Sequence, residues 1–252
     1  RPAMTNFTPG ESANEIAQTL TVNNTAIKPQ TATNWDATLD YYFEPVGNVS
    51  IGFFKKTIED FIVGGLDTGR IGSGSGNGYN GDYANFARLT TFNAGTAFVQ
   101  GWEFSYQQQF TFLPGLLKGL SASANYTVID THGNFGGTAN LSTGQVVGFI
   151  PRAANLMLSW RYRRFNARVL YNRTGDYIVQ YSTASTGFNS YRAALELVNL
   201  GLEYQLRPSL SLTCDISNVF NEPQILYRGF RSRLSSYVMN PPAIIFGVTG
   251  RF

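Results

Sequence analysis

The residues best suited to binding chemistry are three arginines in one short stretch near the C-terminal end. They lie in 227–233, which reads Tyr-Arg-Gly-Phe-Arg-Ser-Arg. A guanidinium group forms paired hydrogen bonds with a carboxylate or a phosphate, so this stretch predicts contact with an anionic group. A solvated loop that binds nothing is the alternative. The candidates are Arg228, Arg231 and Arg233.

The single histidine and the single cysteine leave little scope for metal or nucleophilic chemistry. His132 lies at the end of an expected strand, and it is a candidate contact for a metal-chelate ligand; a solvated loop residue is the alternative. One cysteine, Cys214, cannot form an intrachain disulfide, and the usual zinc sites need several His or Cys ligands. We expect Cys214 to be a small residue on the apolar face of a strand.

Acidic residues lie inside the expected strands without forming a recognisable catalytic pair. Glu196 falls at an apolar position near a strand end. The others fall at polar positions, where they would line a wet interior: Asp36, Asp40, Glu103 and Asp215. The Gly-rich run 72–78 lacks the Lys-Ser/Thr ending of a phosphate-binding loop. The sequence therefore predicts neither an enzyme nor a cofactor.

The composition suits strands that have two different faces. Charged residues make up 14% of the 252 residues and aromatic residues another 14%, while the mean hydropathy is −0.14. No stretch of about 18 apolar residues is present, so the sequence holds no transmembrane helix. The formal net charge of +3 is small, and no dense basic motif indicates nucleic acid as a partner.

Apolar and polar residues alternate along most of the chain. In 198–206, Val, Leu, Leu, Tyr and Leu alternate with Asn, Gly, Glu and Gln. Alternation over about ten residues predicts a strand with one apolar and one polar face. No segment of similar length has a helical period, so we predict an all-β fold. Its nine strands are expected near 33–44, 48–62, 96–111, 119–130, 153–163, 166–178, 193–206, 209–220 and 241–252.

Short and long connections alternate between these strands. The short turns are expected at 44–48, 112–119, 163–166 and 207–209. The long connections are expected at 63–95, 131–152, 179–192 and 221–240, the first of them Gly-rich and mobile. Outer-membrane barrels have short periplasmic turns and long extracellular loops. The pattern therefore predicts an antiparallel up-and-down transmembrane β-barrel.

The expected last strand ends on an aromatic residue. Apolar residues occupy the alternate positions that precede it. This arrangement is similar to the signal that the outer-membrane barrel-assembly machinery recognises, whereas an ordinary edge strand is the alternative. We predict that the assembly signal consists of Ile244, Phe246, Val248 and Phe252.

Three segments resemble the barrel of TonB-dependent outer-membrane receptors. The stretch 23–36 is similar to the family signature that leads into a barrel strand, although Gln30 stands where Glu is usual and Thr-Ala where Pro is usual. The turn and strand in 41–58 follow in the family's order. The element Asn-Val-Phe-Asn-Glu at 218–222 then precedes a terminal Gly-Val-Thr-Gly-Arg-Phe, which looks like the family's last strand.

The resemblance implies a barrel of about 22 strands with an N-terminal plug domain inside it. Nine strands alone would leave two unpaired edges, which lipid does not tolerate. We therefore expect the nine strands to be the C-terminal part of such a barrel, in a piece of a longer protein, whereas a smaller barrel is the alternative. Residues 1–30 would be an extracellular loop and the end of a preceding strand, and residues 31–252 the C-terminal strands.

Membership of this family implies an active-transport receptor. Extracellular loops would capture a ligand such as an iron–siderophore, and the TonB energy-transducing system would drive its import to the periplasm through the plug. Other expected partners are the barrel-assembly machinery and outer-membrane lipid and lipopolysaccharide, whose phosphates the three arginines could contact. A passive outer-membrane porin and a soluble β-sandwich binding module are the alternatives. The sequence leaves the identity of the ligand open.

Overall fold

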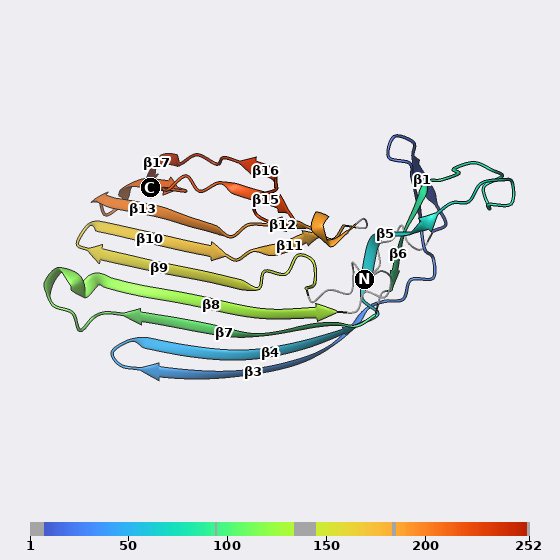
Figure 1. Cartoon of the computed structure of the whole chain (residues 1–252). Helices are drawn as coiled ribbons and strands as arrows, with labels where there is room; N and C mark the ends of the chain where they lie inside the picture. Colours follow the sequence, from blue (N-terminus) through green and yellow to red (C-terminus); the bar gives the residue numbers. More distant parts are fainter. Residues whose placement is uncertain (1–7, 94, 134–144, 183–184, 251–252) are drawn as a thin grey trace.

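The centre of the fold is one antiparallel sheet of nine strands, in the order β17-β14-β13-β10-β9-β8-β7-β4-β3 (Figure 1). The computed structural model describes residues 8–93, 95–133, 145–182 and 185–250. The strands are β3 (Thr31–Phe43), β4 (Gly47–Glu59), β7 (Ala97–Gln109), β8 (Leu120–Gly133), β9 (Arg152–Tyr162), β10 (Phe165–Thr174), β13 (Leu195–Arg207), β14 (Leu210–Ser217) and β17 (Ala243–Gly250).

All nine predicted strands are present, and the prediction of an all-β antiparallel fold is confirmed. The ends differ by a few residues: β10 stops at Thr174 and β14 at Ser217, each earlier than expected. Beyond β10, the Asp176 carboxylate accepts a hydrogen bond from the Ala194 N–H at 2.6 Å, which replaces the strand ladder. Beyond β14, Asn218 has a φ of 49°, which a regular strand does not allow.

The register gathers the apolar side chains on one face of the sheet. Leu202 pairs with Ala167 on one side and with Cys214 on the other, and Cys214 pairs with Phe246. Leu202 and Phe246 remain 45% and 79% exposed because no other part of the described chain covers this face. Glu203 projects to the opposite face, since side chains alternate along a strand. The alternation expected for 198–206 is confirmed.

The connections divide by length between the two ends of the sheet (Figure 1). The short ones lie together at what we call the turn end, and one of them holds the 3-10 helix η2 (Gly115–Gly119). The long ones lie together at the opposite, loop end. A chain that runs up and down through a sheet must place alternate connections at the same end, so nine strands put every long connection on one side.

The long connections and the segment before β3 contain strands of their own. The mobility expected for the first long connection stays a prediction. The first group comprises β1 (Glu11–Asn14), β2 (Thr19–Val22), β5 (Ile62–Arg70) and β6 (Ala87–Asn93), in the sheet order β1-β2-β6-β5. The second comprises β11 (Tyr177–Gln180), β12 (Ser190–Arg192), β15 (Gln224–Arg228) and β16 (Leu234–Val238), in the order β11-β12-β15-β16. The 3-10 helix η3 (Thr186–Phe188) lies between β11 and β12.

The Gly-rich segment between β5 and β6 is organised by one asparagine. The Asn77 amide donates to the carbonyls of Gly72 and Asp82, at 3.1 and 2.8 Å. Its side-chain oxygen accepts from the N–H groups of Tyr79 and Gly81, at 2.9 and 3.0 Å. Four bonds to one side chain hold this segment in a defined turn, because they satisfy backbone groups that would otherwise need water.

Buried side chains are few and lie near the loop end. Ile58, Ala97, Val99 and Val146 form the core cluster there. Elsewhere the sheet is a single layer, with β3 and β17 as its two edges, so within this chain it is not a closed barrel. In the part of the chain that the structure describes, no helix is long and apolar enough to cross a membrane.

Candidate functional site

The arginines of 227–233 lie at the tip of the β15–β16 hairpin, at the loop end of the sheet. Gly229 allows the tight turn there, since its φ is 72° and a side chain would come within 2.5 Å of the Gly187 carbonyl oxygen. The Gly229 N–H donates to the Asn189 carbonyl at 2.9 Å. The tip is therefore fixed against the segment that leads into β12.

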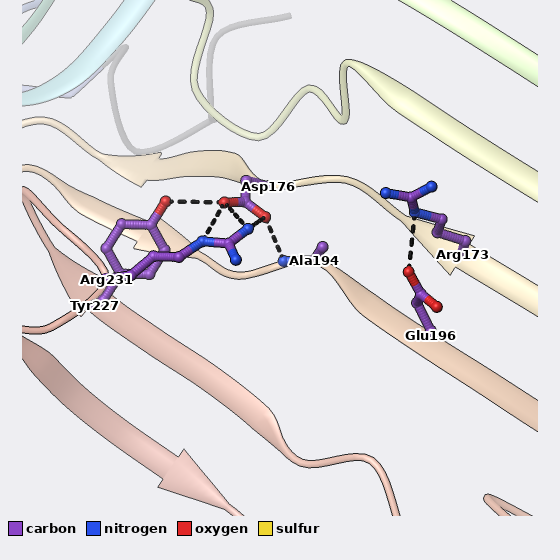
Figure 2. A network of polar contacts seen from close by, with 6 residues as sticks. All are labelled: Arg173, Asp176, Ala194, Glu196, Tyr227 and Arg231. Atoms are coloured by element: carbon purple, nitrogen blue, oxygen red, sulfur yellow. Dashed lines mark hydrogen bonds and ion pairs between the residues drawn. The ribbon is translucent and has the colours of Figure 1, made fainter. Parts of the chain in front are cut away.

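Arg231 is held by an acid that the sequence did not single out (Figure 2). Its Nη2 lies 2.7 Å from Oδ2 and 2.8 Å from Oδ1 of Asp176, and its Nε lies 3.1 Å from Oδ2. The Tyr227 hydroxyl donates to the same carboxylate at 3.2 Å. This paired geometry joins the hairpin tip to the end of β10, so part of the charge of Arg231 is used within the protein.

The surroundings of Asp176 keep its carboxyl group ionised. Partial burial raises its pKa, but hydrogen bonds from Arg231 and from the Ala194 N–H outweigh that effect, and the pKa lies below the usual value of an aspartate. Burial, together with the nearby Asp176 charge, raises the pKa of Tyr227 above its ordinary value. Tyr227 therefore stays neutral and keeps its proton for Asp176.

Arg233 forms a different kind of contact, with two aromatic rings. Its guanidinium carbon lies 5.0 Å from the ring centre of Phe188 and 5.3 Å from that of Phe230. Its Nη1 donates to the Gly187 carbonyl at 3.2 Å. Phe188 and Phe230 remain 48% and 58% exposed. A cation between two exposed rings can bind an anion and stack against a flat ligand.

Arg228 and His132 complete the residues that the sequence suggested. Arg228 is exposed at the end of β15, and its side chain has no hydrogen bond or ion pair to the described residues. His132 is exposed at the loop end of β8, stacked on Phe98 with the ring centres 4.9 Å apart. It lies away from the hairpin, on a strand four positions from β14 in the sheet. Ligand contact by these residues stays a prediction.

A ladder of polar contacts crosses the polar face of the sheet. Arg168 forms an ion pair with Asp215 at 3.0 Å, and the Asn166 amide donates to Glu203 at 3.4 Å. Arg168 passes directly over Gly201, where a side chain would collide with it. The four polar residues border a shallow depression of about 220 Å³. Of these, the sequence indicated Asp215 and Glu203 as residues of the polar face.

The terminal strand places its predicted assembly residues on the apolar face. Ile244 pairs with Ile216, and Val248 pairs with Leu212. Phe246 lies between them in β17 and is 79% exposed. Phe252 lies outside the residues that the structure describes. The role of these residues in assembly stays a prediction.

Known structures share the fold of this chain. A double mutant of the ferric enterobactin receptor PfeA from Pseudomonas aeruginosa matches with a TM-score of 0.67, at 19% identity, over 99% of this chain and 36% of that one. The siderophore receptor PirA from Acinetobacter baumannii matches with a TM-score of 0.66, at 16% identity, over 93% and 33%. The ferric-catecholate import receptor Fiu from E. coli K12 matches with a TM-score of 0.63, at 15% identity, over 91% and 29%.

These likenesses show the fold, and the chain spans about a third of the length of the structures it matches. A comparison with curated protein sequences gives no match. The family model described as TonB dependent receptor-like, beta-barrel matches residues 1–219. The chain therefore belongs to the TonB-dependent receptor β-barrel family of the bacterial outer membrane.

Proposed function

We propose that this chain forms the C-terminal wall of an active-transport receptor that captures an anionic metal chelate of the siderophore class and imports it to the periplasm. The loop end would face the outside of the cell and the turn end the periplasm, as in other outer-membrane barrels. The observation that carries the proposal is the exposed Arg233 guanidinium between Phe188 and Phe230.

The chemistry of this cluster suits such a ligand. Ferric catecholates combine negative charge with flat aromatic rings, which a guanidinium and two phenyl rings can contact together. Arg228 adds a second exposed cation at the end of the same hairpin. The names of the structural neighbours, which include a ferric enterobactin receptor and a ferric-catecholate import receptor, support this ligand class.

Active transport also needs partners outside this chain. We propose that the TonB system acts through a plug domain, because the match covers the barrel portion of the family. The barrel-assembly machinery would insert the strands, and lipid and lipopolysaccharide would surround the apolar face. In the residues that the structure describes, no three His, Cys, Asp or Glu side chains gather into a metal site. The metal would accordingly be recognised within its chelate.

Binding by the full-length receptor tests the ligand class. Replacing Arg233 with Gln should weaken binding of a ferric catecholate by about tenfold or more, the scale of one lost charge-assisted contact. Phe188→Ala should weaken it less, since one ring remains. Arg161→Gln, at the turn end, is the matched control and should bind normally. Normal binding of ferric catecholates and hydroxamates by Arg233→Gln would overturn the assigned site.

Uptake separates active transport from a passive channel. Cells that express the full-length receptor should accumulate radioactive iron from the bound chelate, and deletion of TonB should abolish this uptake while binding to the cells persists. Equal uptake with and without TonB would favour the porin alternative and contradict the proposal.

A further inference from the structure

A second basic site lies at the loop end, on the apolar face of the sheet. A depression of about 380 Å³ opens where β9 begins and β10 ends, beside Tyr126 of β8. Three arginines line it, namely Arg152, Arg173 and Arg231, together with the ring of Tyr126. It is separate from the aromatic pair around Arg233, and ligand capture does not use it.

The register fixes which face these residues occupy. Tyr126 pairs with Ala154, Ala154 pairs with Arg173, and Arg173 pairs with Glu196, so the four side chains form one row across the sheet. Two residues further along β9 from Ala154 lies Leu156, which is 47% exposed. Since alternate residues share a face, the row with Arg173 lies on the same face as Leu156. It borders the exposed apolar side chains of that face, which we call the apolar belt, on the side of the loop end.

The charges in the depression are only partly neutralised. Arg173 forms an ion pair with Glu196 at 3.2 Å, but both side chains are about half exposed, at 55% and 49%. Arg231 is held by Asp176. Arg152 is exposed, and its side chain has no hydrogen bond or ion pair to any described residue. The site thus carries one positive charge more than its neighbouring carboxylates balance.

We propose that this depression binds a phosphate group of the lipopolysaccharide that forms the outer leaflet of the outer membrane. A cationic row directly beyond a belt of exposed Leu, Val and Tyr side chains lies at the height of the headgroups. Arg152 supplies the free guanidinium, Arg173 a second donor, and Tyr126 an amphipathic ring that suits the interface. The assignment rests on the loop end facing outward, and it does not depend on which ligand is imported.

Other anions fit the position less well. A free phosphate would bind without using the apolar belt below the arginines. A phospholipid headgroup offers one phosphate, but the outward-facing leaflet is built of lipopolysaccharide. A phosphate fixed to acylated sugar satisfies both parts of the surface, since the acyl chains cover Leu156 while the phosphate reaches Arg152.

Native mass spectrometry of the full-length receptor in detergent tests the site. Lipid A with its phosphates, lipid A without them, phosphatidylglycerol and inorganic phosphate are the four probes. Arg152→Gln breaks no side-chain hydrogen bond or ion pair to the described residues. With phosphorylated lipid A, it should raise the apparent Kd about tenfold. Arg173→Gln should act in the same direction. Arg161→Gln, on the same strand but the opposite face, is the control and should leave the Kd unchanged.

Three results would overturn the proposal. Arg152→Gln and the unsubstituted receptor could bind phosphorylated lipid A equally well. The receptor could bind the two forms of lipid A equally well, or it could bind phosphatidylglycerol more tightly than lipid A. Each variant must first show the heat-dependent gel mobility of a folded barrel. If Arg152→Gln fails this check, charge reversal at the pair, as Arg173→Glu with Glu196→Arg, provides the second variant, and it should keep the binding.

Discussion

Asn218 illustrates how one side chain can join three parts of this barrel. Its amide donates to the carbonyls of Glu222 and Asn240 at 3.1 and 2.5 Å, and its side-chain oxygen accepts from the Glu222 N–H at 2.8 Å. Its own N–H donates to the Asn199 side chain at 2.9 Å. The residue is 7% exposed. The end of β14 is thereby fixed both to β13 and to the segment that enters β17.

We expect Asn218→Ala to lower the free energy of unfolding by about 1–3 kcal/mol, because it removes three hydrogen bonds to part-buried backbone groups. The measurement is urea-induced unfolding of the full-length receptor in lipid vesicles. Asn125→Ala is the control, since the Asn125 side chain has no hydrogen bond to the described residues, and its effect should stay within about 0.5 kcal/mol. Equal effects of the two substitutions would contradict the role of Asn218.

The ion pair between Asp176 and Arg231 predicts a pH dependence at the loop end. The folded-state pKa of Asp176 is lowered, so its stabilising effect is complete above the ordinary aspartate pKa of about 3.9 and is lost as the pH falls through the folded value. We expect amides of 224–238 to lose protection from hydrogen exchange below about pH 4. Asp176→Asn should show that loss at neutral pH, and unchanged protection in this variant would sink the idea.

Residue-scale contacts were only partly predictable from the sequence. The type and spacing of the three arginines drew attention to the hairpin tip, and the structure places Arg233 in an exposed cluster there. Asp176 and Phe188 were missed because each lies far along the chain from its partner, and no local pattern reveals such a pairing. The resemblance at 218–222 marked Asn218, but the bond to Asn240 depends on strand order, which no local pattern contains.

At the scale of elements, the nine long strands were predictable because each presents an apolar face and a polar face, so its residues alternate in polarity. An alternation such as that of 198–206 is long enough to be recognised. The strands in the long connections and before β3 were missed because most of them are short: six of the eight have only three to five residues. Their pairing depends on neighbours brought together by the large sheet. Asn77, likewise, organises a turn that no local pattern around it had indicated.

We expect the same new charge to destabilise the protein on the apolar face of the large sheet and to have almost no effect on the polar face. Leu202→Arg should cost about 2–4 kcal/mol of unfolding free energy if the residue lies near the bilayer midplane. Gln107→Arg is the matched control on the polar face of β7, and it should change the free energy by no more than about 0.5 kcal/mol. Unfolding of the full-length receptor in vesicles measures both. A larger loss for Gln107→Arg would reverse the assignment of faces.

At the scale of the whole molecule, we expect assembly to depend on the edge strand β17. Its apolar face is widely exposed, with Ile244, Phe246 and Val248 at 58%, 79% and 69%. We expect Phe252→Asp to reduce the outer-membrane level of the full-length receptor strongly, because it removes the terminal aromatic of the predicted assembly signal. Immunoblots of membrane fractions measure this. Tyr237→Asp, outside the nine-strand sheet, is the control, and a normal level of Phe252→Asp would show that the signal lies elsewhere.

The single-layer wall also limits how the chain can change in length. Every residue of a long strand meets either the membrane or the interior, so removing one residue sends all those beyond it to the wrong side, whereas removing two restores the pattern. In the connections at the loop end, the side chains need not alternate between two surroundings, so the number of residues removed does not matter in this way. Length variation in this protein should therefore come in steps of two within β13 and in steps of any size between β5 and β6. Deleting Leu202 alone, compared with deleting Leu202 and Glu203 together, measures the difference as folded receptor in the membrane. Equal yields from the two deletions would show that parity does not govern the wall.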